Sequence, residues 1–293
     1  MAISIFGSLL LLLGWISSIG GSSSSERIGE TTVSVDGTSS KPIDTISSAI
    51  VTNGGSYKLI STHSHDINSF TQGLVFSSHD ESLVIESAGL YGKSDVRIVK
   101  YDTGEVVKKT AIDGKYFAEG VHLSEDGVLY MLTWKERTCL AFDGATLEKR
   151  EDLSFKYQTH TGEGWGITGD GEGNLYVSDG SNFIFVWDSV TKTELRRMEV
   201  RTSQGRPVRF LNELEWYHGD ILANVWYSDV IVRIDVETGI VKHIYDLKKL
   251  YPKKDRNEEA DCLNGIAKMK GSDDLFVTGK QFNKGFRIRL DPE

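Results

Sequence analysis

The sequence predicts an all-β protein, a five-bladed β-propeller closed by an N-terminal strand that completes the last blade. Three observations lead to this prediction. A short polar motif recurs five times at steps of 47, 44, 49 and 52 residues, a period typical of one four-stranded blade. An apolar strand follows each motif at nearly the same distance. The fifth repeat stops after three strands, and a strand without a partner precedes the first repeat.

The recurring motif places a polar residue at the start of the first strand of each repeat. Its five instances, aligned on Gly73, Gly120, Gly164, Glu213 and Gly265, are Thr71-Gln72-Gly73-Leu74, Ala118-Glu119-Gly120-Val121, Gly162-Glu163-Gly164-Trp165, Leu211-Asn212-Glu213-Leu214 and Leu263-Asn264-Gly265-Ile266. Equivalent residues of a propeller repeat surround one axis. We therefore expect the polar residues before the aligned positions to converge there.

The four strands of each repeat differ in character. The first carries the motif, and the second is strongly apolar, as in residues 83–85, 129–132, 175–177, 221–223 and 275–277. The third ends in an aspartate that we expect to form a turn, at Asp102, Asp143, Asp188 and Asp235. The fourth is more polar and suits an outer edge, as in residues 105–109 and 194–199. Pairing the strand at 57–60 with the incomplete fifth repeat closes the ring and removes its free edges.

Two segments precede the propeller. Residues 3–19 form an apolar run, so segment 1–21 is interpreted as a secretory signal peptide or a short signal anchor. Segment 22–55 is rich in Ser, Thr and Gly and is predicted to be disordered or removed. Residues 56–293 are predicted to form the catalytic propeller domain. We therefore expect the protein in the secretory pathway, in the ER or Golgi lumen, the vacuole or outside the cell.

Charge and cysteine content restrict the partners and the redox chemistry. The net charge is −9, from 42 acidic and 33 basic residues, and no basic block is long enough to suggest binding of nucleic acid. A membrane contact is expected only through the possible N-terminal anchor, and the protein is expected to be a monomer.

Cys139 and Cys262 lie in non-neighbouring repeats, where a disulfide is geometrically difficult. We expect two buried free thiols, although a secretory location favours a disulfide.

Three groups of side chains are expected at one mouth of the axis. The first strands contribute Gln72, Glu119, Glu163, Asn212, Glu213 and Asn264. The second strands end in Glu86, Trp134, Asp179, Trp226 and Lys280, and beside these lie Phe70, Phe117 and Trp165. Glu163 and Glu213 suit a structural role, bonding backbone amides between blades. Trp187 and Trp216 suit packing.

The combination at this mouth exceeds what packing requires. A lone acid (Glu119), an ammonium (Lys280), two amides (Gln72 and Asn212) and up to three indoles describe a pocket for a small molecule or a chain end. Aromatic walls also raise the pKa of an enclosed carboxylate, which suits it to general acid/base catalysis.

Seven motifs within about residues 57–290 are together similar to one known family. They are Phe70-Thr71-Gln72-Gly73-Leu74, Phe117-Ala118-Glu119-Gly120, Glu163-Gly164-Trp165-Gly166, Leu211-Asn212-Glu213-Leu214-Glu215, Ala223-Asn224-Val225-Trp226, Leu263-Asn264-Gly265-Ile266-Ala267 and Phe276-Val277-Thr278-Gly279-Lys280. In this order they resemble the plant- and bacterial-type glutaminyl-peptide cyclotransferases (glutaminyl cyclases), which are unrelated to the zinc-dependent animal enzymes.

This resemblance implies a five-bladed propeller and an ammonia-releasing acyltransferase. Its substrates would be peptides or proteins with an N-terminal glutamine, and it would use no metal or other cofactor. The α-amine attacks the side-chain γ-carbonyl of the same residue, ammonia leaves, and the chain then begins with pyroglutamate.

The resemblance also implies roles for individual residues. Glu119 would be the general acid/base, Gln72 and Asn212 would hold the γ-amide and the first peptide group, and Lys280 would stabilise the oxyanion or orient Glu119. The substrate-binding residues would be Phe70, Phe117, Trp134, Trp165, Trp226 and Asn264. The sequence departs from the family pattern at Ala118, where glycine is usual. It departs again at Gln281-Phe282-Asn283, where a tryptophan-containing segment is usual at the outer rim.

Two other functions stay open on the residues alone. A metal-dependent propeller lactonase or hydrolase would need three or more oxygen or imidazole ligands at the axis, for which Glu119, Glu163 and Glu213 are candidates. The seven histidines share no repeat position, which disfavours a histidine-based site. A non-catalytic propeller that binds peptide ends would use the same aromatic cage.

Overall fold

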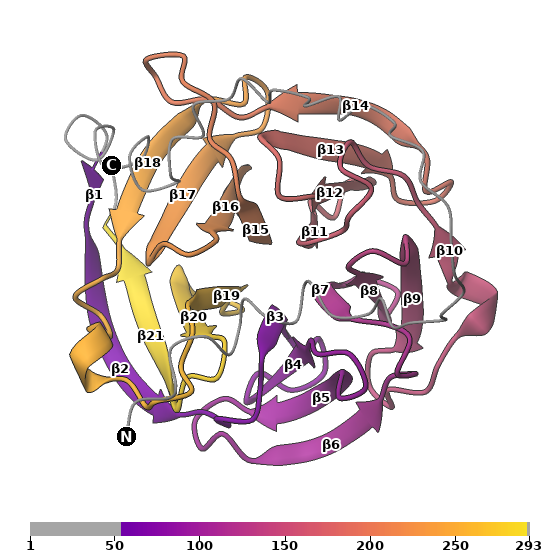
Figure 1. The fold of residues 1–293 in the computed structure, drawn as a ribbon, viewed down its shortest axis with the longest axis horizontal. Coiled ribbons are helices and arrows are strands. Elements are labelled where there is room, and N and C mark those ends of the chain that lie inside the picture. Colours follow the sequence, from indigo (N-terminus) through magenta and orange to yellow (C-terminus); the bar gives the residue numbers. More distant parts are fainter. Residues whose placement is uncertain (1–53, 292–293) are drawn as a thin grey trace, which may run out of the picture. The chain divides into compact units, whose positions relative to one another are not determined.

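The computed structural model describes residues 54–291, which form five sheets around a common axis and confirm the predicted five-bladed propeller (Figure 1). Blade 1 comprises β3 (Thr71–Phe76), β4 (Leu83–Ala88), β5 (Asp95–Lys100) and β6 (Val106–Ala111). Blade 2 comprises β7 (Ala118–Leu123), β8 (Val128–Thr133), β9 (Thr138–Asp143) and β10 (Phe155–Lys156). Blade 3 comprises β11 (Ile167–Gly169), β12 (Asn174–Ser178), β13 (Phe183–Asp188) and β14 (Glu194–Glu199).

The last two blades contain the strands from both ends of the propeller. Blade 4 comprises β15 (Leu211–Tyr217), β16 (Asp220–Val225), β17 (Val230–Asp235) and β18 (Val241–Asp246). Blade 5 comprises β19 (Leu263–Lys268), β20 (Asp274–Gly279), β21 (Lys284–Leu290) and, at its outer edge, β2 (Tyr57–Ser64). Short 3-10 turns lie at Glu151–Leu153 and Lys253–Asp255. In each blade the first strand of the repeat lies nearest the axis (Figure 1).

Closure by the N-terminal strand is confirmed. β2 pairs antiparallel with β21 along its length, from Tyr57 opposite Leu290 to Ser64 opposite Lys284. One pairing was not predicted: the two-residue strand β1 (Gly54–Gly55) lies parallel to β18 and adds a fifth strand to blade 4. The apolar run expected within residues 1–21 lies outside the described residues, and so does nearly all of segment 22–55. Within 54–291 no helix is long and apolar enough to cross a membrane.

The hydrophobic core is divided into five clusters, each between two neighbouring blades. The cluster between blades 3 and 4 contains 17 buried residues among those described, and the cluster between blades 4 and 5 contains 14. The cluster that joins blade 5 to blade 1 is much smaller, with Leu74, Phe76, Val84, Val99, Ala267 and Phe276. The closing interface therefore has the smallest apolar cluster among the described residues. Polar contacts contribute a larger share of its stability than at the other interfaces.

In blades 1, 2 and 3 the inner strand approaches the next blade so closely that one glycine in each has no room for a side chain. A Cβ atom on Gly73 would lie 2.4 Å from the Val121 nitrogen of blade 2, and one on Gly120 would lie 2.7 Å from the Trp165 carbonyl oxygen of blade 3. A Cβ atom on Gly166 would lie 2.1 Å from the Asn212 carbonyl oxygen of blade 4. Real Cβ atoms essentially never approach closer than 3.0 Å. Backbone crowding at the axis therefore explains the glycine at these three positions, whereas Gly265 is required by its φ of 109°.

These contacts correct the alignment of the third repeat, which was placed on Gly164. The position equivalent to Gly73 and Gly120 is Gly166, because it faces the next blade and precedes the strand residue Ile167 that pairs with Val177. The four steps become 47, 46, 47 and 52 residues. The residue equivalent to Glu119 in blade 3 is consequently Trp165. A second Glu-Gly dipeptide two residues upstream caused the misalignment.

Other structural expectations are mostly met. Asp143, Asp188 and Asp235 each accept hydrogen bonds from backbone N–H groups of the turn that follows. Trp187 is buried, and Trp216 stacks on Tyr176 with 5.3 Å between ring centroids.

The charged segment 251–261 is attached to the propeller by its arginine. Its Arg256 lies 2.8 Å from Asp229 in an ion pair whose side chains are both largely buried. The Arg256 guanidinium also lies over the ring of Phe282, at 4.8 Å from the ring centroid.

We predict that Gly120→Ala lowers the free energy of unfolding by about 1–3 kcal/mol, the usual cost of overpacking. The added methyl group meets backbone of blade 3, which cannot move aside alone. Gly114→Ala is the matched control, because its added Cβ would lie 3.4 Å from the nearest atom, an ordinary contact. Denaturant unfolding measures both variants, and equal stabilities would contradict the explanation of the motif.

We also predict that neither cysteine reacts with a thiol reagent in the native protein at pH 8. Both thiols are free and buried, as expected from the sequence. Burial raises the pKa of Cys139 far above its usual value and that of Cys262 to about 11, which removes the reactive thiolate. Both should react after unfolding in denaturant. Rapid labelling of the folded protein would contradict this.

Candidate active site

Five equivalent residues surround the axis one position before the crowded backbone contacts, and we call them the polar ring. They are Gln72, Glu119, Trp165, Asn212 and Asn264. The amide nitrogen of Gln72 donates to Glu119 Oε1 at 3.4 Å, and the amide nitrogen of Asn264 donates to Gln72 Oε1 at 3.4 Å. All members except Trp165 are buried. The structure thus brings together side chains from three blades that the sequence placed in one site.

Hydrogen bonds between neighbouring blades position the polar ring. Ser87 Oγ donates to the Glu119 carbonyl at 2.6 Å, and Ser178 Oγ donates in the same way to the Asn212 carbonyl at 2.6 Å. Asn264 Nδ2 donates to the Thr71 carbonyl at 3.0 Å, next to Gln72. Each of these bonds crosses from one blade to the next, so the positions of the site residues depend on the assembled ring.

An aromatic wall, consisting of Phe70, Phe117, Trp134, Trp165 and Trp226, lies beside the polar ring. Its members are half-buried. Ring centroids lie 6.4 Å apart for Phe70 and Phe117, 5.6 Å for Phe117 and Trp134, and 5.3 Å for Trp165 and Trp226. Lys280 Nζ lies 4.9 Å from the Phe70 centroid and connects blade 5 to this series. The six predicted residues therefore form two series of contacts, one from Lys280 through Phe70 and Phe117 to Trp134, and one of Trp165 with Trp226.

Glu163 connects the two halves of the aromatic wall. The indole N–H groups of Trp134 and Trp165 both donate to its Oε2 atom, at 2.8 and 2.9 Å. Glu163 therefore has the expected structural role, but its hydrogen-bond donors are indoles and not backbone amides. Glu213 does form the expected bond between blades, because its Oε2 atom accepts from the Ile266 nitrogen at 2.9 Å.

Two glycines make room for the wall. Gly89 and Gly180 occupy places in blades 1 and 3 that correspond to Trp134, two residues beyond the partner of the crowded strand position. A Cβ atom on Gly180 would lie 2.5 Å from the Trp165 ring, and one on Gly89 would lie 2.4 Å from the Phe117 ring. Small residues thus alternate with bulky ones around the mouth.

The sequence reasoning missed three aromatic residues near the wall. Phe210 lies 6.2 Å from Trp226, Tyr91 lies 5.3 Å from Phe117, and Tyr227 lies 4.3 Å from Trp226, measured between ring centroids. A signal for Phe210 was present, because it precedes Asn212 by two residues as Phe70 precedes Gln72 and Phe117 precedes Glu119. The two tyrosines occupy loops and have no such repeat signal.

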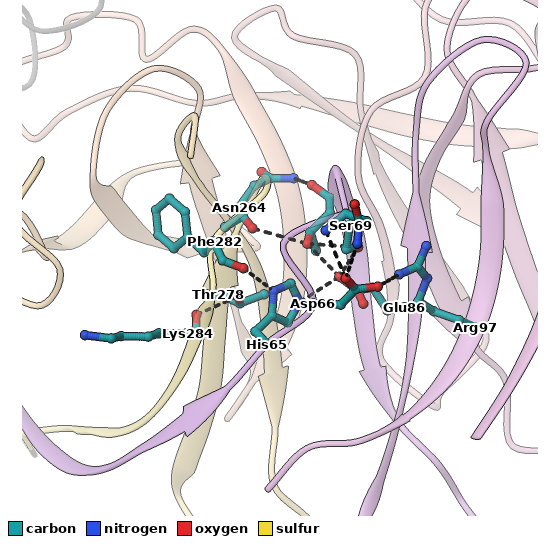
Figure 2. A network of polar contacts seen from close by, with 12 residues as sticks. His65, Asp66, Ser69, Glu86, Arg97, Asn264, Thr278, Phe282 and Lys284 are labelled. Atoms are coloured by element: carbon teal, nitrogen blue, oxygen red, sulfur yellow. Dashed lines mark hydrogen bonds and ion pairs between the residues drawn. The ribbon is translucent and has the colours of Figure 1, made fainter. Parts of the chain in front are cut away.

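Glu86 does not lie at the end of its strand as expected, whereas Asp179 directly follows β12. Strand β4 continues to Ala88, so Glu86 lies inside the strand, where its carboxylate accepts a hydrogen bond from His65 (Figure 2). Asp179 accepts hydrogen bonds from the Thr161 nitrogen at 2.8 Å and the Ser181 nitrogen at 3.1 Å, which makes it a turn residue. The predicted second strand of blade 1 ends at residue 85, whereas β4 continues for three further residues.

Burial and neighbouring charges set the protonation of Glu119. Burial is the largest effect and raises the pKa of this carboxyl well above its usual range, and the negative charges of Glu163 and Glu136 raise it further. The ammonium of Lys280 acts in the opposite direction. The site therefore holds a carboxyl whose protonated form is favoured by its surroundings, as a general acid/base requires. Among residues 54–291 no three His, Cys, Asp or Glu side chains lie close enough together to hold a metal ion.

Comparison with known proteins identifies the family. The model of the family described as glutamine cyclotransferase matches residues 33–290. This chain belongs to that family. The glutaminyl-peptide cyclotransferase of Arabidopsis thaliana is 37% identical over 235 residues, which cover 80% of this chain and 71% of that protein. The crystal structure of the Myxococcus xanthus glutaminyl cyclase superposes with a TM-score of 0.71 at 31% identity, covering 82% of this chain and 98% of that one.

The two departures from the family pattern are accommodated in different ways. Ala118 begins strand β7 and is not among the described residues with positive φ, so the backbone there does not require glycine. After Lys280, Gln281 adopts a φ of 57° and its N–H donates to the Ser69 carbonyl at 2.6 Å. Phe282 is fully buried. This cyclotransferase therefore turns its chain inward where the family pattern has a tryptophan-containing rim.

Proposed function

We propose that this chain is a glutaminyl-peptide cyclotransferase that converts N-terminal glutamine of peptides and proteins to pyroglutamate and releases ammonia, with Glu119 as the general acid/base. The observation that carries the assignment of Glu119 is its setting. It is a buried carboxyl of raised pKa that contacts an amide side chain and feels the charge of Lys280. The family to which the chain belongs, and the relative from Arabidopsis thaliana that bears this enzyme's name, support the reaction.

One carboxyl can perform both proton transfers of the reaction. The α-amine forms a bond to the γ-carbonyl carbon, and its nitrogen then gives a proton to the Glu119 carboxylate. The bond between that carbon and the amide nitrogen breaks, and Glu119 returns the proton to the leaving nitrogen, which departs as ammonia. General acid/base catalysis is most efficient when the pKa lies near the working pH. Burial of Glu119 moves its pKa in that direction.

Buried atoms without partners indicate where substrate groups bind. Among the described residues, the amide oxygens Asn212 Oδ1 and Asn264 Oδ1 are buried and accept no hydrogen bond. A buried acceptor without a donor costs about 1–3 kcal/mol, so these oxygens are ready to receive N–H groups of the substrate. Gln72 and Lys280 supply donors for the oxygen that becomes negative in the tetrahedral intermediate.

The aromatic wall suits the neutral side chain of glutamine. Half-buried rings exclude water from one side of the polar ring, which strengthens the electrostatic effect of Lys280 on a developing oxyanion. The wall also favours the compact conformer in which the amine lies against the γ-carbonyl. Well-oriented intramolecular reactions reach effective molarities of about 10⁵–10⁸ M, so this proximity supplies a large part of the rate.

The cellular setting is also a proposal. We propose that the protein acts as a monomer in the secretory pathway, where its substrates expose their N-termini after signal cleavage. The apolar character of residues 3–19 supports this location. A peptide-binding propeller without turnover would use the same wall, and release of ammonia separates the two functions.

We predict that Glu119→Gln folds normally but loses about 10²- to 10⁴-fold in kcat, the usual contribution of general acid/base catalysis. Ammonia release from a glutamine-initiated dipeptide, with and without EDTA, measures turnover. Glu215→Gln is the matched control, because Glu215 is another carboxyl whose burial raises its pKa, to about 8, yet it bonds the Lys268 nitrogen away from the polar ring. Near-normal activity of Glu119→Gln would show that another group moves the proton.

We predict opposite shifts of the acidic limb of the kcat profile for two further variants. Below its pKa Glu119 is protonated and cannot accept the amine proton, so kcat falls as the pH falls through that pKa. Lys280→Met removes the charge that lowers the pKa of Glu119 and should move the limb to higher pH. Glu136→Gln removes a charge that raises this pKa and should move the limb to lower pH. Shifts in the same direction would contradict the role of Glu119.

A further inference from the structure

A buried ion pair lies directly behind the polar ring at the closing interface, and the reaction described above does not use it. His65 follows strand β2, and both of its ring nitrogens are bonded: Nδ1 lies 2.8 Å from the Phe282 carbonyl oxygen, and Nε2 lies 3.0 Å from Glu86 Oε1 (Figure 2). A carbonyl oxygen can only accept, so Nδ1 carries a hydrogen. Glu86 is a carboxylate that also accepts, so Nε2 carries one too. On these contacts we assign His65 as an imidazolium.

Glu86 gathers donors from the segment that leads to Gln72. Its Oε1 atom accepts from Ser69 Oγ and from Thr71 Oγ1, each at 2.6 Å, in addition to His65. Thr71 is the first residue of β3 and precedes Gln72. Burial raises the pKa of Glu86, but the charge and hydrogen bond of His65 and the charge of Arg97 outweigh this and lower it to about 2. The carboxylate is thus a fixed anchor for the start of β3.

The same pair holds the turn that carries Lys280. His65 bonds the Phe282 carbonyl through its ring and the Asn283 carbonyl through its backbone nitrogen, at 3.1 Å. On the other side of Lys280, the Gly279 carbonyl oxygen lies 3.3 Å from Thr71 Oγ1, whose single hydrogen is donated to Glu86 at 2.6 Å. Residues on both sides of Lys280 therefore contact the group of side chains around Glu86.

The ion pair lies at the interface between blades that has the smallest apolar cluster. It crosses from blade 5 to blade 1, where the apolar cluster contains only six of the described buried residues. Fewer apolar contacts there leave the relative position of β3 and the Lys280 turn more dependent on polar contacts. Gln72 lies on one side of this interface and Lys280 on the other, and both act on the same substrate group in the proposed reaction.

We propose that the ion pair of protonated His65 with Glu86 is a positioning pair for cyclisation, which holds Gln72 and Lys280 in register across the closing interface. This inference rests on the proposed function. Neither residue touches the substrate, so both act through the groups that they hold. If His65 loses a proton, one of its two hydrogen bonds is lost, and either the Lys280 turn or the start of β3 is released.

The sign of the pH dependence follows from the groups around His65. Burial lowers the pKa of His65, but the charge and hydrogen bond of Glu86, the bond to the Phe282 carbonyl and the charge of Asp66 raise it by more. Arg97, the cation nearest to Glu86, is itself paired with Asp66 at 2.8 Å and Asp95 at 2.6 Å. The pair is therefore complete below the usual histidine pKa of about 6.5 and is lost as the pH rises through the raised value.

The variant that tests the pair is His65→Gln, which removes the positive charge and has one donor nitrogen where the imidazolium has two. We expect kcat at pH 7 to fall roughly 10- to 100-fold, the effect of misplacing catalytic groups by up to about 1 Å, with a smaller change in KM. His63→Gln is the matched control. His63 lies two residues earlier on β2, and its ring nitrogens face Ser61 and the Asp102 carbonyl at 2.7 and 3.3 Å. It should keep wild-type kcat.

The pH profile separates positioning from a merely structural role. In the wild type the pair itself breaks at high pH, so the ratio of wild-type to His65→Gln kcat should shrink toward one as the pH rises. A structural defect would give a ratio that does not change with pH. The same breakage gives the wild type an alkaline limb that the variant lacks.

A measurement on the wild-type protein keeps the proposal testable if the variant does not fold. Nitrogen NMR of histidine-labelled protein reports the protonation of both ring nitrogens, which we expect for His65 at pH 7.5, above the usual pKa of about 6.5. A neutral His65 at that pH overturns the proposal. So does an active wild type whose profile and kcat are unchanged in His65→Gln. An inactive wild type would instead overturn the proposed function, and this inference with it.

Discussion

The close approach of the inner strands at the axis is the constraint on which the rest of the structure depends. Backbone atoms of one blade occupy the space where a Cβ of the preceding blade would lie, at Gly73, Gly120 and Gly166. The residues just before these positions are thereby forced together around the axis, although they are about 47 residues apart in the chain. The repeat thus provides five equivalent positions around the axis. Different side chains occupy these positions and form the site.

Burial has a larger effect on the protonation of Glu119 than its charged neighbours have. Glu119 is buried beside the Gln72 amide, so its negative form is disfavoured, while Lys280 limits how far its pKa rises. Glu163 adds to this field and also fixes two indoles through one oxygen atom. The aromatic wall and the pKa of Glu119 are therefore linked, because the Glu163 carboxylate binds two indoles of the wall and also raises that pKa. Groups arranged in this way before the substrate arrives need little rearrangement during the reaction.

The sequence predicted what depends on periodicity and missed what depends on contacts between distant segments. The period gave five blades and the closing strand, and the motifs gave Gln72, Glu119, Asn212 and Asn264. The register of the third repeat was wrong because Glu163-Gly164 imitates the motif two residues early. Glu86 was misplaced because strand ends cannot be located to one residue from hydropathy. Its partner His65 could not be found, since their contact exists only after the ring closes.

The pairing of β2 with β21 joins the first part of the propeller to the last. Ser64 and Lys284 are partners in this ladder. Strand β2 can therefore begin to pair with β21 only after about 220 further residues have been synthesised. At about 5–20 residues per second, synthesis of that stretch takes roughly 10 to 40 s. During this time the early strand is an open edge that other chains can pair with. The ring can therefore close only after β21 (Lys284–Leu290) has been made, and the relative position of blades 5 and 1 is set at that step.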